Sequence, residues 1–179
     1  YFLIGVYISA AIATRLNIIL ASVFFLYFLL KKPFKLNSLL FFSFPILLTL
    51  FSIGYYNYIR FGTPFESGYN LQIVNEETVK RRDKGLFSPA HIPSNLFFML
   101  LKGPEPALDE AHELKPPFIT FDAYGLSLFF LSPVLFLIFK ANFQKELIKI
   151  SAITAAIVLI PIVTYYGIGQ RQVGFRYAL

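Results

Sequence analysis

Two arginines near the end of the sequence are the residues best suited to chemistry. Arg171 and Arg176 follow an uncharged, largely apolar run over 150–170. A guanidinium group donates two parallel hydrogen bonds to a phosphate and stays charged when it is partly desolvated. The pair therefore predicts a site for the phosphate of a lipid-linked substrate, with Arg15 as a weaker third member. Contact with ordinary lipid headgroups is the competing interpretation.

Few other residues offer chemistry. The stretch 109–113 carries carboxylates and His112, which could hold a divalent cation, but a solvated acidic loop is the simpler interpretation. His91 is a lone histidine for which we expect a structural role. The chain has no cysteine, phosphate-binding glycine-rich loop, nucleophile elbow or metalloprotease signature. We therefore assign no catalytic residue and no metal site, and a divalent cation is the one candidate cofactor.

The composition points to a bilayer as the solvent of this chain. Hydrophobic residues make up 56% of the sequence and charged residues 15%, compared with about 25% charged residues in an average soluble domain. The 22 phenylalanines and 11 tyrosines exclude disorder. The net charge of +6 comes from basic residues that flank apolar runs. Such charges orient helices in a membrane, so we expect lipid and not nucleic acid as the partner.

The apolar runs predict an all-α, multi-pass transmembrane helical bundle. Residues 36–59 and 150–170 are long enough to span a bilayer, whereas 16–30 and 123–139 lie near the lower limit. A hairpin near 14–17 is favoured over one long helix, because the long helix would bury Arg15 at the centre of the membrane. The predicted organisation is transmembrane helices over 1–59, an extracytoplasmic loop over 60–122, and transmembrane helices with the start of a further span over 123–179. The chain reads as an internal piece of a longer protein.

Lysines in short connections predict the orientation. Lys31, Lys32 and Lys35 precede one predicted span, and Lys140, Lys145 and Lys149 precede another, which places both connections in the cytoplasm. The protein is then expected in a cell membrane, and a bacterial inner membrane fits best.

The extracytoplasmic loop region is expected to contain short interfacial helices. Asn75 can cap a helix in which Glu77 faces Arg81, and the basic run 80–84 then forms a solvated helix face. Residues 95–102 are too short to span and should lie on the membrane surface. Pro45, Pro133 and Pro161 should kink the spans without ending them.

Several stretches resemble bacterial membrane proteins of the GT-C glycosyltransferase superfamily, the relatives of protein O-mannosyltransferases and lipid A sugar transferases. These stretches are YNYIRFGTPFESGY (56–69), GLFSP (85–89), NLFFMLL (95–101), GLSLFFLSP (125–133) and GFRY (174–177). The resemblance implies an enzyme that transfers a sugar from a polyprenyl-phosphate donor to an acceptor on the extracytoplasmic face. It also implies that the acidic catalytic residue lies in an earlier loop, outside this sequence. A transporter or flippase fragment, or a protein like an O-antigen polymerase or ligase, is the alternative.

Overall fold

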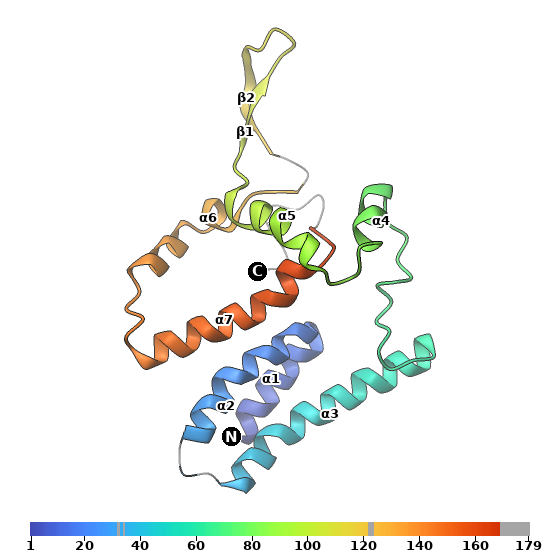
Figure 1. Ribbon diagram of the computed structural model, residues 1–179, viewed down its shortest axis with the longest axis vertical. Helices are drawn as coiled ribbons and strands as arrows, with labels where there is room; N and C mark the ends of the chain where they lie inside the picture. Colours follow the sequence, from blue (N-terminus) through green and yellow to red (C-terminus); the bar gives the residue numbers. More distant parts are fainter. Residues whose placement is uncertain (32, 34, 122–123, 169–179) are drawn as a thin grey trace. The chain divides into compact units, whose positions relative to one another are not determined.

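A computed structural model describes residues 1–31, 33, 35–121 and 124–168 (Figure 1). The chain divides into two compact units. The first unit comprises Tyr1–Val74 and Glu146–Val158, and the second comprises the described parts of Asn75–Lys145 and Leu159–Leu179. Helix α7 (Glu146–Thr164) therefore begins in the first unit and ends in the second.

The first unit is helical. It contains α1 (Phe2–Thr14), the 3-10 helix η1 (Leu16–Ala21), α2 (Ser22–Lys31), α3 (Leu36–Phe61) and the start of α7. Arg15 has extended backbone angles, φ −147° and ψ 110°, so the helix breaks where the sequence predicts a turn. Its hydrophobic core consists of Ile8, Ile12, Leu29, Phe42 and Ile46, and the polar side chains Ser9 and Thr154 are buried as well.

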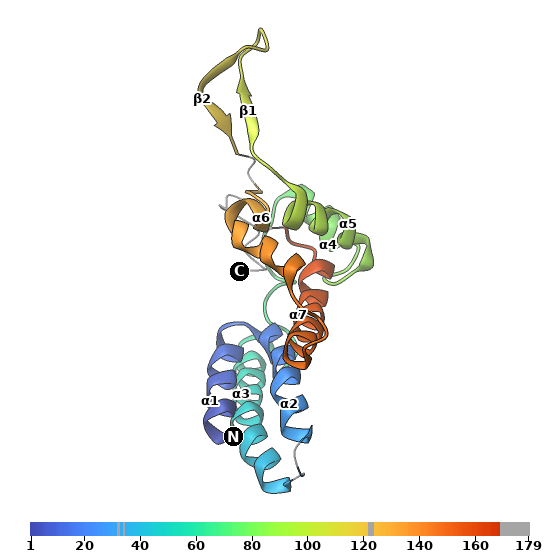
Figure 2. The same ribbon diagram turned by 90° about the vertical axis from the view of Figure 1, so that its left-hand side faces the viewer.

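Helices α1 and α3 pack side by side in both views of the structure (Figures 1 and 2). Gly5 of α1 sits so close to α3 that an added Cβ would lie 2.3 Å from the Phe42 carbonyl oxygen and 2.9 Å from Pro45 Cγ. The absence of a side chain at Gly5 is therefore a condition for this packing.

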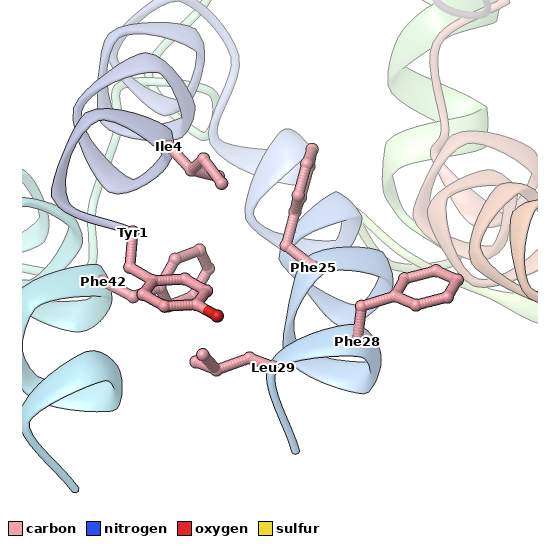
Figure 3. Close-up of a pocket in the computed structure, with 6 residues that line it drawn as sticks. All are labelled: Tyr1, Ile4, Phe25, Phe28, Leu29 and Phe42. Atoms are coloured by element: carbon pink, nitrogen blue, oxygen red, sulfur yellow. The ribbon is translucent and has the colours of Figure 1, made fainter. Parts of the chain in front are cut away.

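A small cavity of about 100 Å³ lies in the same unit. It is lined by Tyr1, Ile4, Phe25, Phe28, Leu29 and Phe42 (Figure 3).

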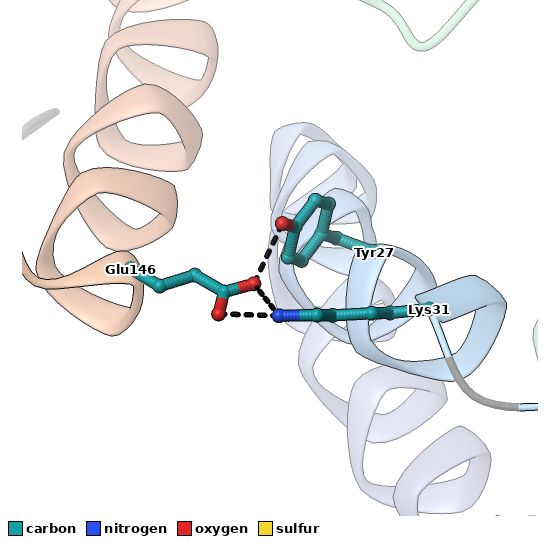
Figure 4. A network of polar contacts seen from close by, with 3 residues as sticks. All are labelled: Tyr27, Lys31 and Glu146. Atoms are coloured by element: carbon teal, nitrogen blue, oxygen red, sulfur yellow. Dashed lines mark hydrogen bonds and ion pairs between the residues drawn. The ribbon is translucent and has the colours of Figure 1, made fainter.

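A polar cluster ties α2 to the first residue of α7 (Figure 4). The Glu146 carboxylate forms an ion pair with the Lys31 ammonium group and accepts a hydrogen bond of 2.7 Å from the Tyr27 hydroxyl. The end of α2, at the first predicted lysine-rich connection, thus contacts the start of α7, at the second. All three side chains are exposed, so the ion pair contributes little to stability.

The second unit mixes short helices with a hairpin. Along the chain its elements are α4 (Glu76–Arg82), the 3-10 helix η2 (Pro89–His91), α5 (Ile92–Leu96), the π-helix η3 (Phe97–Leu101), β1 (Glu105–Leu108), β2 (Leu114–Thr120), α6 (Leu128–Leu131) and the 3-10 helix η4 (Pro133–Lys140). Strands β1 and β2 pair antiparallel, with Glu105 opposite Thr120 and a bulge before Leu108. The end of α7 completes the unit.

The prediction of an all-α, multi-pass transmembrane bundle is wrong. In the part of the chain that the structure describes, only α3 and α7 are long and apolar enough to cross a membrane. The predicted span over 123–139 is divided into α6 and η4, because Pro133 lacks the N–H that would continue the helix. The segment before it, which was expected to be loop, forms the β-hairpin, and prolines 106, 116 and 117 disfavour a helix there.

Other local predictions hold. Asn75 caps α4 by accepting a hydrogen bond of 3.0 Å from the Thr78 backbone N–H. Pro45 and Pro161 lie inside continuous helices. The predicted short helix over 95–102 is present as the last turns of a helical segment that begins at Ile92.

Substituting Gly5 tests the close contact between α1 and α3. Gly5→Ala should lower the free energy of unfolding by about 1–3 kcal/mol, because the new methyl group overlaps α3 backbone. Gly54→Ala is the matched control in α3, since its Cβ would meet only Pro64 Cβ, at 3.7 Å. The control should be neutral or stabilising by up to about 1 kcal/mol. Unfolding of the purified protein in detergent measures both, and equal effects would contradict the assigned contact.

Candidate functional site

The sequence-predicted phosphate site is only partly within the described structure. Arg171 and Arg176 lie outside the described residues. Arg15 is exposed at the junction of α1 and η1, where its backbone N–H donates to the Ala11 carbonyl. Whether these three arginines cooperate stays a prediction.

The acidic stretch forms the tip of the β-hairpin. One carboxylate oxygen of Asp109 accepts hydrogen bonds of 2.9 Å from the backbone N–H groups of both Ala111 and Glu113. This carboxylate therefore shapes the turn. Within the described residues no group of three or more histidine, aspartate or glutamate side chains is placed to hold a metal ion. The divalent cation considered from the sequence gains no ligand set from this part of the chain.

His91 has the structural role expected for it. Its side chain is buried, and its ring nitrogen Nε2 lies 3.0 Å from the Gly85 carbonyl oxygen. Gly85 itself has a positive φ of 108°, which a residue with a side chain rarely adopts. The histidine thus fixes the loop that leads from α4 to α5.

The guanidinium group of Arg81, for which the sequence analysis predicts no binding role, forms the centre of the best-defined polar site. Arg81, the second-last residue of α4, donates three hydrogen bonds to different parts of the second unit. Its Nε donates to the Tyr166 carbonyl oxygen at 2.6 Å, and its terminal nitrogens donate to Ser94 Oγ at 2.8 Å and to Asn95 Oδ1 at 3.0 Å. We call Arg81 and these three partners the Arg81 cradle.

Asn95 gives the cradle its rigidity. Its side chain is fully buried, and its amide nitrogen donates to the carbonyl oxygens of Val163 at 2.8 Å and Tyr165 at 2.7 Å. These carbonyls belong to the last turn of α7 and the residue after it, where no helical N–H follows to bind them. One buried amide therefore holds both the end of α7 and the orientation of Arg81.

Backbone hydrogen bonds fasten the same region. The Ser88 N–H donates to the Thr164 carbonyl at 2.8 Å, and the Tyr166 N–H donates to the Leu86 carbonyl at 2.9 Å. Tyr166 is buried. The chain that leaves α7 is therefore clamped between the 85–88 loop and the Arg81 cradle.

The electrostatics of the cradle are unusual because the partners of Arg81 are all neutral. No carboxylate forms an ion pair with Arg81 in the described part of the chain. Glu77 lies four residues before Arg81 in α4, as predicted, but its carboxylate accepts a hydrogen bond of 3.1 Å from the Tyr124 hydroxyl. Partial burial lowers the pKa of Arg81 from its ordinary value, and the nearby Tyr124 opposes that shift. An arginine starts from so high a pKa that it keeps its charge.

The prediction that 80–84 forms a solvated helix face is therefore wrong for Arg81. Its contacts join positions 85 residues apart in the chain, and no local pattern reports such a contact. The one sequence signal is the polar pair Ser94 and Asn95 directly before an apolar run, which marks a helix that must bury polar groups.

Comparison with known proteins adds no relative. No protein-family model, no curated protein and no solved structure matches this chain.

Removing the Asn95 amide should destabilise the second unit. Asn95→Leu keeps the size of the side chain but leaves two carbonyls and one Arg81 N–H without their partner, so we expect a loss of about 2–4 kcal/mol in unfolding free energy. The control is Asn37→Leu, at an exposed asparagine of α3. Denaturation in detergent measures both. A cost for Asn95→Leu no larger than that of the control would contradict the structural role of the amide.

Proposed function

We propose that this chain is part of a membrane-bound glycosyltransferase that takes a sugar from a polyprenyl-phosphate donor. The acceptor would receive the sugar on the extracytoplasmic side of a cell membrane, in bacteria the inner membrane. The proposal rests on the resemblance of the sequence to the GT-C superfamily and on one structural observation, the exposed apolar surface of α3 and α7.

The apolar surface supports the membrane location. Only 17% of the most apolar stretch of α3, and 11% of that of α7, is buried within the protein. A core helix of a soluble protein would be mostly buried. Side chains such as Leu47, Phe51 and Ile160 are instead more than half exposed. Lipid tails are the solvent that such helices fit.

The order of residues after α7 supports the phosphate substrate. Helix α7 ends at Thr164, and Arg171 and Arg176 follow a few residues later in the sequence. If α7 crosses the bilayer, cationic groups close behind its end lie near the depth of lipid phosphates. An arginine fork there would bind the donor phosphate and stabilise the charge that develops on it as the sugar departs. The catalytic acid or base is expected in another part of the full-length protein.

The middle of each long helix argues against transport. Between Asn37 and Ile59 in α3, and between Ile150 and Thr164 in α7, there is no lysine, arginine, aspartate or glutamate. Transporters commonly place such residues inside their spans to bind ions or substrates. The glycosyltransferase is therefore favoured over the transporter or flippase alternative.

Arg176 provides the test of donor binding. In the full-length protein Arg176→Ala should raise the apparent KM for the polyprenyl-phosphate donor by roughly 10- to 150-fold. This is the loss of affinity expected when a partly buried, charge-assisted hydrogen bond is removed. Arg176→Lys should recover only part of the loss, since an ammonium group lacks the bidentate fork. Sugar transfer is measured against donor concentration in a defined detergent.

The matched control is Arg60→Ala. Arg60 is exposed, and its guanidinium stacks on Tyr56 and Phe61 at the end of α3. This variant should transfer sugar with an unchanged KM. No transfer from any polyprenyl-phosphate sugar by the wild-type protein would overturn the proposed function, and an unchanged donor KM in Arg176→Ala would remove the role of that arginine.

A further inference from the structure

We propose that the Arg81 cradle at the end of α7 is a binding site for a phosphate group. The site is distinct from Arg171 and Arg176, and it does not require that the protein transfer sugars. The same chemistry is offered by a lipid headgroup at the membrane surface and by a free phosphate ion in water.

The first reason is the unbalanced charge of the cradle. Arg81 is half-buried, and its three hydrogen-bond partners are two neutral side chains and a backbone carbonyl. Removing a charge from water is costly unless an opposite charge compensates for it. Because no carboxylate in the described residues pairs with Arg81, an external anion would bind this guanidinium without displacing a carboxylate.

The second reason is that the Arg81 guanidinium is already oriented and still has N–H donors that the cradle does not use. A guanidinium carries five N–H donors, and the cradle uses one on Nε and one on each terminal nitrogen. Among the described residues no acceptor takes the second N–H of either terminal nitrogen, so both are left for a ligand. Asn95 and Ser94 hold the group in place before any ligand arrives, which reduces the entropy lost on binding.

The third reason is the position of the cradle along the chain. It contacts the residues that directly follow α7, a helix long and apolar enough to cross a membrane. Phosphate is the anion that bilayers display where such helices leave the hydrocarbon region. A binding partner with at least two adjacent oxygens matches the two remaining donors.

A purely structural role explains less of the geometry. Asn95 already binds the carbonyls of Val163 and Tyr165, so only the contact from Nε to the Tyr166 carbonyl is left as a helix-end function for Arg81. A lysine could supply that single bond. The structural role and the phosphate site therefore make different predictions for Arg81→Lys.

The experiment measures phosphate binding by the full chain in an uncharged detergent at constant ionic strength. Inorganic phosphate is the probe, and the dissociation constant is obtained by calorimetry. Arg81→Lys should weaken binding roughly 10- to 150-fold, since it loses the bidentate fork. Lys84→Gln, which removes one exposed positive charge just after α4, is the control and should change binding by less than about twofold.

Two further variants keep the test decisive if Arg81→Lys does not fold. Ser94→Ala retains the charge and removes one acceptor that orients the fork, so binding should weaken by roughly 2- to 10-fold. Glu77→Gln removes the negative charge that is held beside Tyr124, and it should tighten binding. Both variants leave the Asn95 contacts in place.

The source of the phosphate is assigned by competition. Phosphatidylglycerol or a polyprenyl monophosphate added to the micelles should displace inorganic phosphate if the natural ligand is a lipid, and failure to displace it assigns the site to a soluble phosphate. Either result supports a phosphate site. Absence of measurable phosphate binding by the wild-type protein, or an equal affinity in the wild type, Arg81→Lys and Ser94→Ala, would overturn the proposal and leave Arg81 a structural role.

Discussion

The unburied apolar surface of α3 and α7 is the constraint on which the rest of the structure depends. Helix α3 exposes most of its leucine, isoleucine and phenylalanine side chains, α7 exposes Leu147, Ile153 and Ile160, and little of the most apolar stretch of either helix is buried within the protein. Water would make so much exposed apolar area unfavourable, at about 25 cal/mol per Å². A bilayer would remove that cost, and it fits the absence of charged residues between Asn37 and Ile59 and between Ile150 and Thr164.

The end of α7 presents a second problem, because its last carbonyls have no helical partner. In the second unit the buried amide of Asn95 in α5 and the guanidinium of Arg81 in α4 donate hydrogen bonds to carbonyls at and just after this helix end. Asn95 binds two carbonyls and also fixes Arg81, so the end of the apolar helix and an oriented positive charge are held by one network. The energetic balance favours this arrangement only because each buried polar group in it is hydrogen-bonded.

Helix caps and helix breaks could be predicted from the sequence where a single residue determines them. The cap at Asn75 and the break near Arg15 follow from the residues themselves. Pro133 was predicted to kink a continuous helix, but it instead separates α6 from η4. Its missing N–H is not compensated by neighbouring segments in the way that bilayer helices allow. The hairpin was missed because its pairing joins residues up to 15 positions apart, with prolines in both strands.

The Arg81 cradle was not predicted from the sequence, and Arg171 and Arg176 lie outside the described residues. Composition and charge drew attention to Arg171 and Arg176, whereas the Arg81 cradle depends on contacts between α4, α5 and the end of α7. A basic run such as 80–84 usually marks a solvated helix face, and only the tertiary structure shows that one of its members turns inward. Charge patterning reports the sign of a surface but not which side chain finds a buried partner.

The central claim is that α3 and α7 are immersed in lipid, and the absence of cysteine makes it directly testable. Single cysteines at Phe51 in α3, Ile153 in α7 and Lys84 after α4 would each carry a nitroxide in lipid nanodiscs. Collision with oxygen, which concentrates in the hydrocarbon region, is then compared with collision with a water-soluble nickel chelate. Lipid immersion predicts high oxygen and low nickel accessibility at positions 51 and 153, and the reverse at position 84. High nickel accessibility at positions 51 and 153 would contradict the account.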